Sequence, residues 1–297
     1  MRRYRASTVE PAVYECVVNI SEGRDAATIA DVAAAGGPLV LDVHSDPDHH
    51  RSVLTLAGQP SDLYEAVRAL TRTAVSLIDL RNHAGVHPRF GAVDVVPWVA
   101  LQGWPLSPAS LDEARAIRDR FAEWAGDSLG LPCFLYGDER TLPELRRSAW
   151  SALRPDFGPD RPHPTAGAAA VGARPALVAY NVWLSEPDLE NARQIAAELR
   201  GPRLRTLALR VGEHVQVSCN LIDPWRVGPG AVYDAVARRA QVSRGELVGL
   251  MPRTVLDSEP DRRWPELGLS PTTTIEARLE QAGLDGGRFR KSTKSGR

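Results

Sequence analysis

Apolar residues recur with two different periods along the chain. Short runs rich in Val and Leu alternate with longer segments in which apolar residues return every three or four positions. The first pattern is typical of buried strands, and the second is typical of helices that cover a sheet. The sequence therefore predicts the α/β fold class.

In the first half, five short apolar runs bounded by Gly, Pro, Asp or Asn predict strands. They cover residues 14–19, 39–43, 53–57, 92–100 and 133–136. Two helices are expected between them, over residues 62–80 and 110–129. In the first of these helices Leu63, Val67 and Leu70 share one face, whereas Arg68 and Arg72 face away from it.

Residues 155–175 interrupt this pattern with five prolines and three glycines, which weaken any regular element. We expect an extended loop there and a domain boundary near Arg174. A second unit follows, with strands over 176–184, 203–211, 215–221 and 247–250 and helices over 187–199 and 230–240. The predicted organisation is an extension (1–12), a first subdomain (13–174), a second subdomain (175–284) and a disordered, basic tail (285–297).

Composition narrows the classes of function. The chain has 297 residues, of which 43% are hydrophobic and 25% charged, as in ordinary globular proteins. A formal net charge of -1 argues against a general binder of nucleic acid or membrane surfaces. No run of about 18 apolar residues and no secretory h-region occurs, so we expect a cytoplasmic protein. Cys16, Cys133 and Cys219 lie in apolar runs and are expected to be buried free thiols.

Histidines are concentrated in two short segments between predicted elements. Residues 44–51 contain His44, His49 and His50, and residues 83–89 contain His83 and His87, which makes five of the seven histidines. Imidazole titrates near neutral pH, so such clusters are suited to proton transfer or metal binding. For the first segment, ordinary solvated side chains are an equally good interpretation.

His87 is the better catalytic candidate. Gly85 and Pro88 break any helix, and Pro88 restricts the backbone of His87 to an extended conformation, which helps to orient its imidazole. His83 and His87 have the spacing of two zinc ligands on a helix. The helix breakers argue against that arrangement, and no Glu lies beside His83 as in metalloprotease motifs. A metal-dependent amide or amidine hydrolase therefore remains a minor alternative.

Several short motifs follow one another along the chain. Residues 15–24 read E-C-V-V-N-I-S-E-G-R, which is similar to the E-C-V-x-N-x-S-E-G of the formiminotransferase family. Residues 83–95 read H-A-G-V-H-P-R-F-G-A-V-D-V and resemble the family's central motif. P-D-F-G-P from Pro155, Q-V-S-x-N-L from Gln216 and L-V-G-L from Leu247 follow in the family's order. The resemblance covers residues from about 14 to 283.

The resemblance implies two α/β subdomains whose sheets face one another across a ligand tunnel. It also implies transfer of a formimino or a formyl group between glutamate and N5 of tetrahydrofolate, a co-substrate, with no metal. His87 matches the catalytic histidine. The folate-binding loop matches Gly158, Pro159, Asp160, Arg161, Pro162, His163, Pro164, Thr165, Ala166 and Gly167. The length suggests the monofunctional form without a cyclodeaminase domain, and a homodimer stays open.

Polar residues near the histidines are candidates for substrate binding. Both substrates carry carboxylates, which arginine binds in a two-point fork, and Arg51 and Arg89 flank the histidine segments. Asn19 and Ser21 could hydrogen-bond the pterin or the amidine, although turn formation is an alternative role. His44 stands where the animal family members have Asp, and Ala166 replaces an aromatic residue. A folate-binding protein without transfer chemistry is therefore the second alternative.

Overall fold

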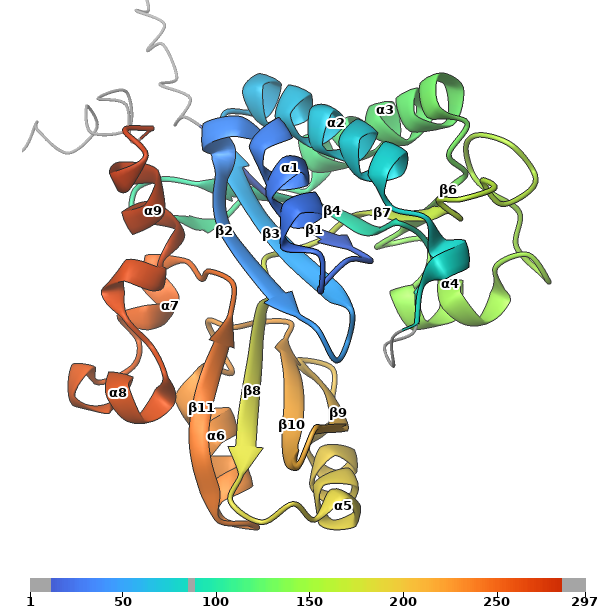
Figure 1. Ribbon diagram of the computed structural model, residues 1–297. Helices are drawn as coiled ribbons and strands as arrows, with labels where there is room; N and C mark the ends of the chain where they lie inside the picture. The colour runs from blue at the N-terminus through green and yellow to red at the C-terminus, as the bar shows by residue number, and fades with distance from the viewer. Residues whose placement is uncertain (1–11, 85–88, 285–297) are drawn as a thin grey trace, which may run out of the picture.

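The computed structural model describes residues 12–84 and 89–284. Two subdomains lie one above the other in Figure 1, and each is a β-sheet with helices packed against it. The predicted α/β fold class is therefore confirmed. The helices and strands of the first subdomain precede those of the second along the chain.

A seven-stranded sheet forms the first subdomain. Its strands are β1 (Ala12–Ile20), β2 (Val40–Asp46), β3 (Arg51–Gly58), β4 (Val93–Gln102), β5 (Ser107–Pro108), β6 (Cys133–Tyr136) and β7 (Ala169–Ala173). The strand order is β2-β3-β1-β4-β7-β6, and β5 pairs with β4. β7 runs parallel to β4 and to β6, whereas the other pairs are antiparallel.

Three helices cover one face of this sheet: α1 (Ala26–Ala35), α2 (Pro60–Leu77) and α3 (Asp112–Leu129). α2 buries Leu63, Val67 and Leu70 as its periodicity predicts, and the core also takes Val18 and Ile20 from β1. The sequence pattern does not predict α1 or the short helix α4 (Leu142–Ser148). The three cysteines are buried free thiols, as expected.

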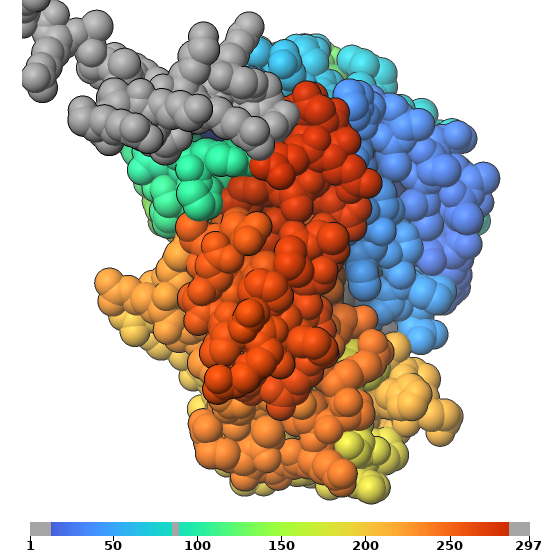
Figure 2. Space-filling model, turned by 90° about the vertical axis from the view of Figure 1, so that its left-hand side faces the viewer, coloured from blue at the N-terminus to red at the C-terminus, as the bar shows by residue number. Residues whose placement is uncertain are grey.

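The second subdomain is an antiparallel sheet of four strands in the order β11-β8-β10-β9. Its strands are β8 (Val178–Leu184), β9 (Leu204–Val211), β10 (His214–Leu221) and β11 (Val242–Val248). α5 (Leu189–Leu199) and α6 (Pro229–Ala237) pack on one face. The chain continues through α7 (Arg253–Leu256), α8 (Trp264–Leu267) and α9 (Ile275–Gln281). Figure 2 shows this last segment along the side of both subdomains.

Two sequence predictions need correction. Residues 155–175 are not loop throughout, because Ala169–Ala173 form β7, which lies between β4 and the edge strand β6. This strand consists of small residues, and a Cβ on Gly172 would lie 2.3 Å from the ring of Tyr136. Close packing requires small residues here, and Ala and Gly have low strand propensity. The sequence therefore carries little signal for a strand at this position. The strand predicted at 247–250 is instead β11, which begins at Val242.

A separate apolar cluster joins the subdomains. Val13 and Val99 from the first sheet belong to it together with Leu250 from beyond β11 and Ile275 from α9. Next to this cluster, Glu276 accepts hydrogen bonds from the backbone N–H groups of Leu106 at 2.7 Å and Arg253 at 2.8 Å. One carboxylate therefore holds backbone groups from both subdomains.

Glu15 brings a second carboxyl group to this buried interface. It is 2% exposed and lies opposite Ala57 and Val99 in the sheet register. Burial raises its pKa from the ordinary 4.5 to about 7, while Arg174 opposes the shift and Glu276 adds to it. The folded state therefore favours the neutral acid.

This pKa makes a prediction about stability and pH. Because the pKa is higher in the folded state, the contribution of Glu15 is full below pH 4.5 and is lost as pH rises through 7. Glu15→Gln should match the wild type near pH 4.5 and exceed its free energy of unfolding at pH 8 by on the order of 3 kcal/mol. Urea denaturation at both pH values measures this. Glu213→Gln, at an exposed position, is the control, and parallel curves for Glu15→Gln and wild type would refute the prediction.

Candidate functional site

Asn19 and Arg51 lie together on the face of the first sheet that faces away from α1 to α3. Arg51 donates from Nε and Nη2 to Oδ1 of Asn19, at 3.0 and 2.6 Å. Nδ2 of Asn19 donates to the carbonyl of Val17 at 2.9 Å, which directs the amide oxygen to the arginine. Two of the predicted substrate-binding residues are thus in direct contact.

Asp94 is the buried centre of this cluster. Its side chain is fully buried, and Oδ2 accepts a hydrogen bond from Nη1 of Arg51 at 2.9 Å. Oδ1 accepts from the backbone N–H of Phe90 at 2.5 Å. A buried carboxylate needs such partners because the loss of its hydration is costly. Asp94 therefore links Arg51 to Phe90, the residue that directly follows the histidine segment 83–89.

Three guanidinium groups surround this one carboxylate. Nη2 of Arg146 donates to Oδ2 of Asp94 at 2.6 Å, and Asp94 also attracts the charge of Arg89. Burial lowers the pKa of Arg51, Asp94 opposes that shift, and Arg146 and Arg89 strengthen it. The three arginines outnumber the one aspartate that they face. Such an excess favours an anionic ligand.

Two histidines are stacked beside the arginines. The rings of His50 and His83 have centroids 3.8 Å apart, and Nε2 of His50 lies 3.0 Å from Oε1 of Glu22. Burial raises the pKa of Glu22, but backbone N–H groups and His50 outweigh it, so its pKa is lowered overall. The carboxylate can only accept, so Nε2 of His50 must carry a proton.

His83 has two polar neighbours at Nε2, one that can only accept a hydrogen bond and one that can only donate. Nε2 of His83 lies 3.0 Å from the carbonyl oxygen of His50, which also can only accept. Nη1 of Arg89 is 3.3 Å from the same Nε2. In a neutral His50 ring Nδ1 therefore keeps its lone pair. Among the described residues, neither Nδ1 of His50 nor Nδ1 of His83 has a hydrogen-bond partner, and both atoms are buried.

The remaining polar candidates have other positions. Ser21 is buried and fastens the segment before β4, because Oγ donates to the carbonyl of Gly91 at 2.8 Å and its N–H donates to Ala92 at 2.9 Å. His44 lies on edge strand β2, opposite Val53 and two strands away from Asn19. His44 and Asn19 both lie opposite Val53 and therefore share one row across the sheet, but His44 lies outside the arginine cluster.

The predicted folate loop is fastened to the histidine segment by backbone hydrogen bonds. Leu80 N–H donates to Thr165 at 2.9 Å, and Ala92 N–H donates to Ala166 at 2.9 Å. The chain approaches so closely here that a Cβ on Gly91 would lie 1.9 Å from the carbonyl oxygen of Ala168. The predicted folate loop is therefore hydrogen-bonded to the chain just before and just after the histidine segment 83–89.

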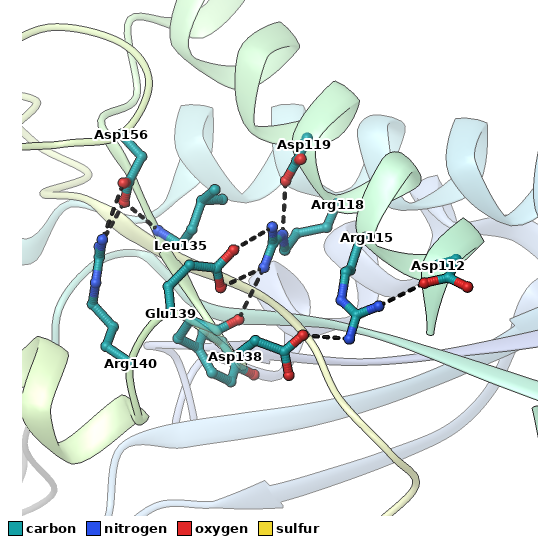
Figure 3. Close-up of polar contacts among 10 residues, drawn as sticks. Asp112, Arg115, Arg118, Asp119, Leu135, Asp138, Glu139, Arg140 and Asp156 are labelled. Carbon is teal, nitrogen blue, oxygen red and sulfur yellow. Dashed lines mark hydrogen bonds and ion pairs between the residues drawn. The ribbon is translucent and has the colours of Figure 1, made fainter. Parts of the chain in front are cut away.

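A network of ion pairs supports the start of the same loop (Figure 3). Asp156 accepts from the N–H of Leu135 at 2.7 Å and from Nη1 of Arg140 at 2.8 Å. Nearby, the buried Arg118 binds both carboxylate oxygens of Glu139 at 2.8 Å. The loop thus begins at a fixed point beside β6, although residues 158–162 are exposed.

His87 lies outside the described residues, so its predicted role stays a prediction. The described residues on either side of it, His83 and Arg89, belong to the cluster above. Sequence reasoning missed Asp94 as a site residue although it belongs to the 83–95 motif. It also missed Arg146, whose helix begins with a capping box formed by Thr141 and Glu144. The T-x-x-E spacing was the available signal.

Comparison with known proteins identifies the family. A model of the formiminotransferase domain, N-terminal subdomain, matches residues 13–174. The chain belongs to the formiminotransferase family. Glutamate formimidoyltransferase of Streptococcus pyogenes serotype M1 is 34% identical, over 82% of this chain and 90% of the relative. Glutamate formimidoyltransferase of Thermoplasma acidophilum is 32% identical, over 91% of this chain and 98% of the relative.

Other formiminotransferase-family relatives are longer. Formimidoyltransferase-cyclodeaminase of Sus scrofa is 34% identical over 282 residues, which are 82% of this chain and 51% of the relative. The chain therefore spans about half the length of that relative. The family match to residues 13–174 includes β1 to β7 and the predicted folate loop.

The described part of this family member has neither a membrane-spanning helix nor a group of potential metal ligands. No helix within residues 12–84 and 89–284 is long and apolar enough to cross a membrane. Over those same ranges, no three His, Cys, Asp or Glu side chains are grouped to hold a metal ion. In the first histidine turn, His49 is instead paired with Asp46, with Nδ1 2.5 Å from Oδ2.

Proposed function

We propose that the chain transfers a formimino group between glutamate and N5 of tetrahydrofolate, which acts as a co-substrate. The observation that carries the proposal is the junction of three features at one place. These are the segment that matches the family's folate loop, the histidine motif and the cluster of three arginines at Asp94. The names of the relatives that the chain matches almost end to end support the same reaction.

The chemistry assigns distinct work to these features. The attacking nitrogen forms a bond to the C=N carbon, and the tetrahedral intermediate then loses the glutamate nitrogen, which must gain a proton. His87 takes the proton from the attacking nitrogen and returns it to the departing one, which is worth about 100- to 10,000-fold in rate. The arginine cluster holds carboxylates of the substrates, so that the reacting atoms stay close.

The test is a transfer assay with purified protein, formiminoglutamate and tetrahydrofolate. We expect turnover that a chelator does not change, together with a rise in melting temperature when 5-formyltetrahydrofolate is added. Folate at 100 times its Kd should stabilise the native state by about 2.7 kcal/mol. Stabilisation without turnover would identify a folate-binding protein without transfer chemistry. Turnover that the chelator abolishes would instead favour a metal-dependent hydrolase.

A further inference from the structure

Arg146 differs from Arg51 in how its guanidinium group is used. All three nitrogens of Arg51 are engaged, Nε and Nη2 by Asn19 and Nη1 by Asp94. Arg146 donates to Asp94 from Nη2 alone, and within the described residues its Nε is buried without a hydrogen-bond partner. A guanidinium has five N–H donors. Arg146 therefore keeps most of its donors for another group.

The position of Arg146 suits a ligand from solution. Its side chain is 25% exposed, whereas the Asp94 carboxylate behind it is fully buried. Asp94 carries one negative charge and contacts both Arg51 and Arg146. Within the described residues it is the only acidic side chain paired with Arg146, so the charge of Arg146 is only partly compensated, and an incoming anion would add the missing compensation.

We propose that Arg146 is a substrate-binding residue that takes a carboxylate of a glutamate-type ligand in the fork formed by its remaining N–H groups. The inference rests on the proposed function, because that function supplies the glutamate carboxylates. Asp94 holds the guanidinium in place, and the planar fork matches the two oxygens of a carboxylate. Arg51 serves as the rigid support of this arrangement, because its own donors are used within the protein.

The carboxylate can come from two sources, the formimino donor or the glutamyl tail of the folate. The experiment separates them with three probes. Isothermal calorimetry measures the Kd of formiminoglutamate, of 5-formyltetrahydrofolate and of 5-formyltetrahydropterin, which lacks the glutamyl tail. These titrations measure binding without turnover, so they remain informative if the transfer assay fails.

The variants are Arg146→Ala and Arg146→Lys, with Arg147→Ala as the matched control. Arg147 is the next residue of α4 and is exposed. Removing a charge-assisted pair of hydrogen bonds should weaken binding roughly 10- to 100-fold. Arg146→Lys should recover only part of this loss, since an ammonium group keeps the charge but not the fork. The melting temperature of each variant checks that it is folded.

If Arg146 binds the donor, its variants raise the Kd of formiminoglutamate. The Kd values of 5-formyltetrahydrofolate and 5-formyltetrahydropterin then stay unchanged. If it binds the folate tail, they raise the Kd of 5-formyltetrahydrofolate and leave the tail-less pterin unchanged. Either result supports the proposal. Folded Arg146 variants with wild-type Kd values for all three probes would overturn it, as would an equal loss in Arg147→Ala. Intact carboxylate binding without transfer would count against the proposed function alone.

Discussion

His87→Ala should lower the turnover rate of formimino transfer by roughly 100-fold or more while leaving folding and folate affinity nearly unchanged. The group acts mainly in the transition state, so its loss appears in kcat rather than in ligand dissociation. Pro88 restricts the backbone of His87, and Arg89 next to it belongs to the arginine cluster. Steady-state kinetics with formiminoglutamate and tetrahydrofolate, together with calorimetry of 5-formyltetrahydrofolate, provide the measurement.

The control for this variant is His214→Ala, an exposed histidine at the start of β10 in the second sheet. It should keep the wild-type rate. Equal rates in His87→Ala and wild type would refute the assignment of His87. If folate affinity fell as much as the rate, His87 would be a ligand-binding residue, and the acid–base group would have to be sought between His44 and Arg51.

Asp94→Asn should lower the free energy of unfolding by about 3–5 kcal/mol, the usual cost of removing one partner from a buried ion pair. The side chain has no exposed surface and compensates Arg51 and Arg146 at the same oxygen. Asparagine keeps the shape but adds N–H groups that face guanidinium donors. Urea denaturation at pH 7 gives the change in the free energy of unfolding. The comparison requires that the variant keep the secondary structure of the wild type.

Glu65→Gln is the matched control, because it removes a carboxylate from an ion pair on the surface. Glu65 is 64% exposed, and its pair with Arg68 should contribute less than about 1 kcal/mol. A loss in Asp94→Asn no larger than in Glu65→Gln would contradict the role of Asp94. Adding Arg146→Met to Asp94→Asn should recover part of the stability, since it removes one of the uncompensated charges.

The sequence predicts most of the first sheet because its strands and α2 carry apolar side chains at regular spacing. β7 escapes prediction for a physical reason, since its strand positions are filled by Ala and Gly that pack under Tyr136. α4 escapes because seven residues are too few for a periodic signal. The histidine and folate segments were recognisable as motifs.

The contact between Asp94 and Arg146 depends on tertiary structure. Arg146 and Asp94 are 52 positions apart in sequence, and no local pattern shows that they share an oxygen. The sequence could propose Arg51 and Arg89 as binders of carboxylates. It could not distinguish an arginine whose donors are used within the protein, such as Arg51, from one with donors left for a ligand.

The place of β7 in the sheet also matters while the chain is being made. β7 is the last strand of the first sheet to be synthesised, yet it lies between β4 and β6. A ribosome releases the N-terminal end first, so β6 emerges before the strand that connects it to β4 exists. Until then the backbone groups of β4 form an open edge that can pair with another nascent chain. The first sheet can therefore be completed only after β7 has left the ribosome.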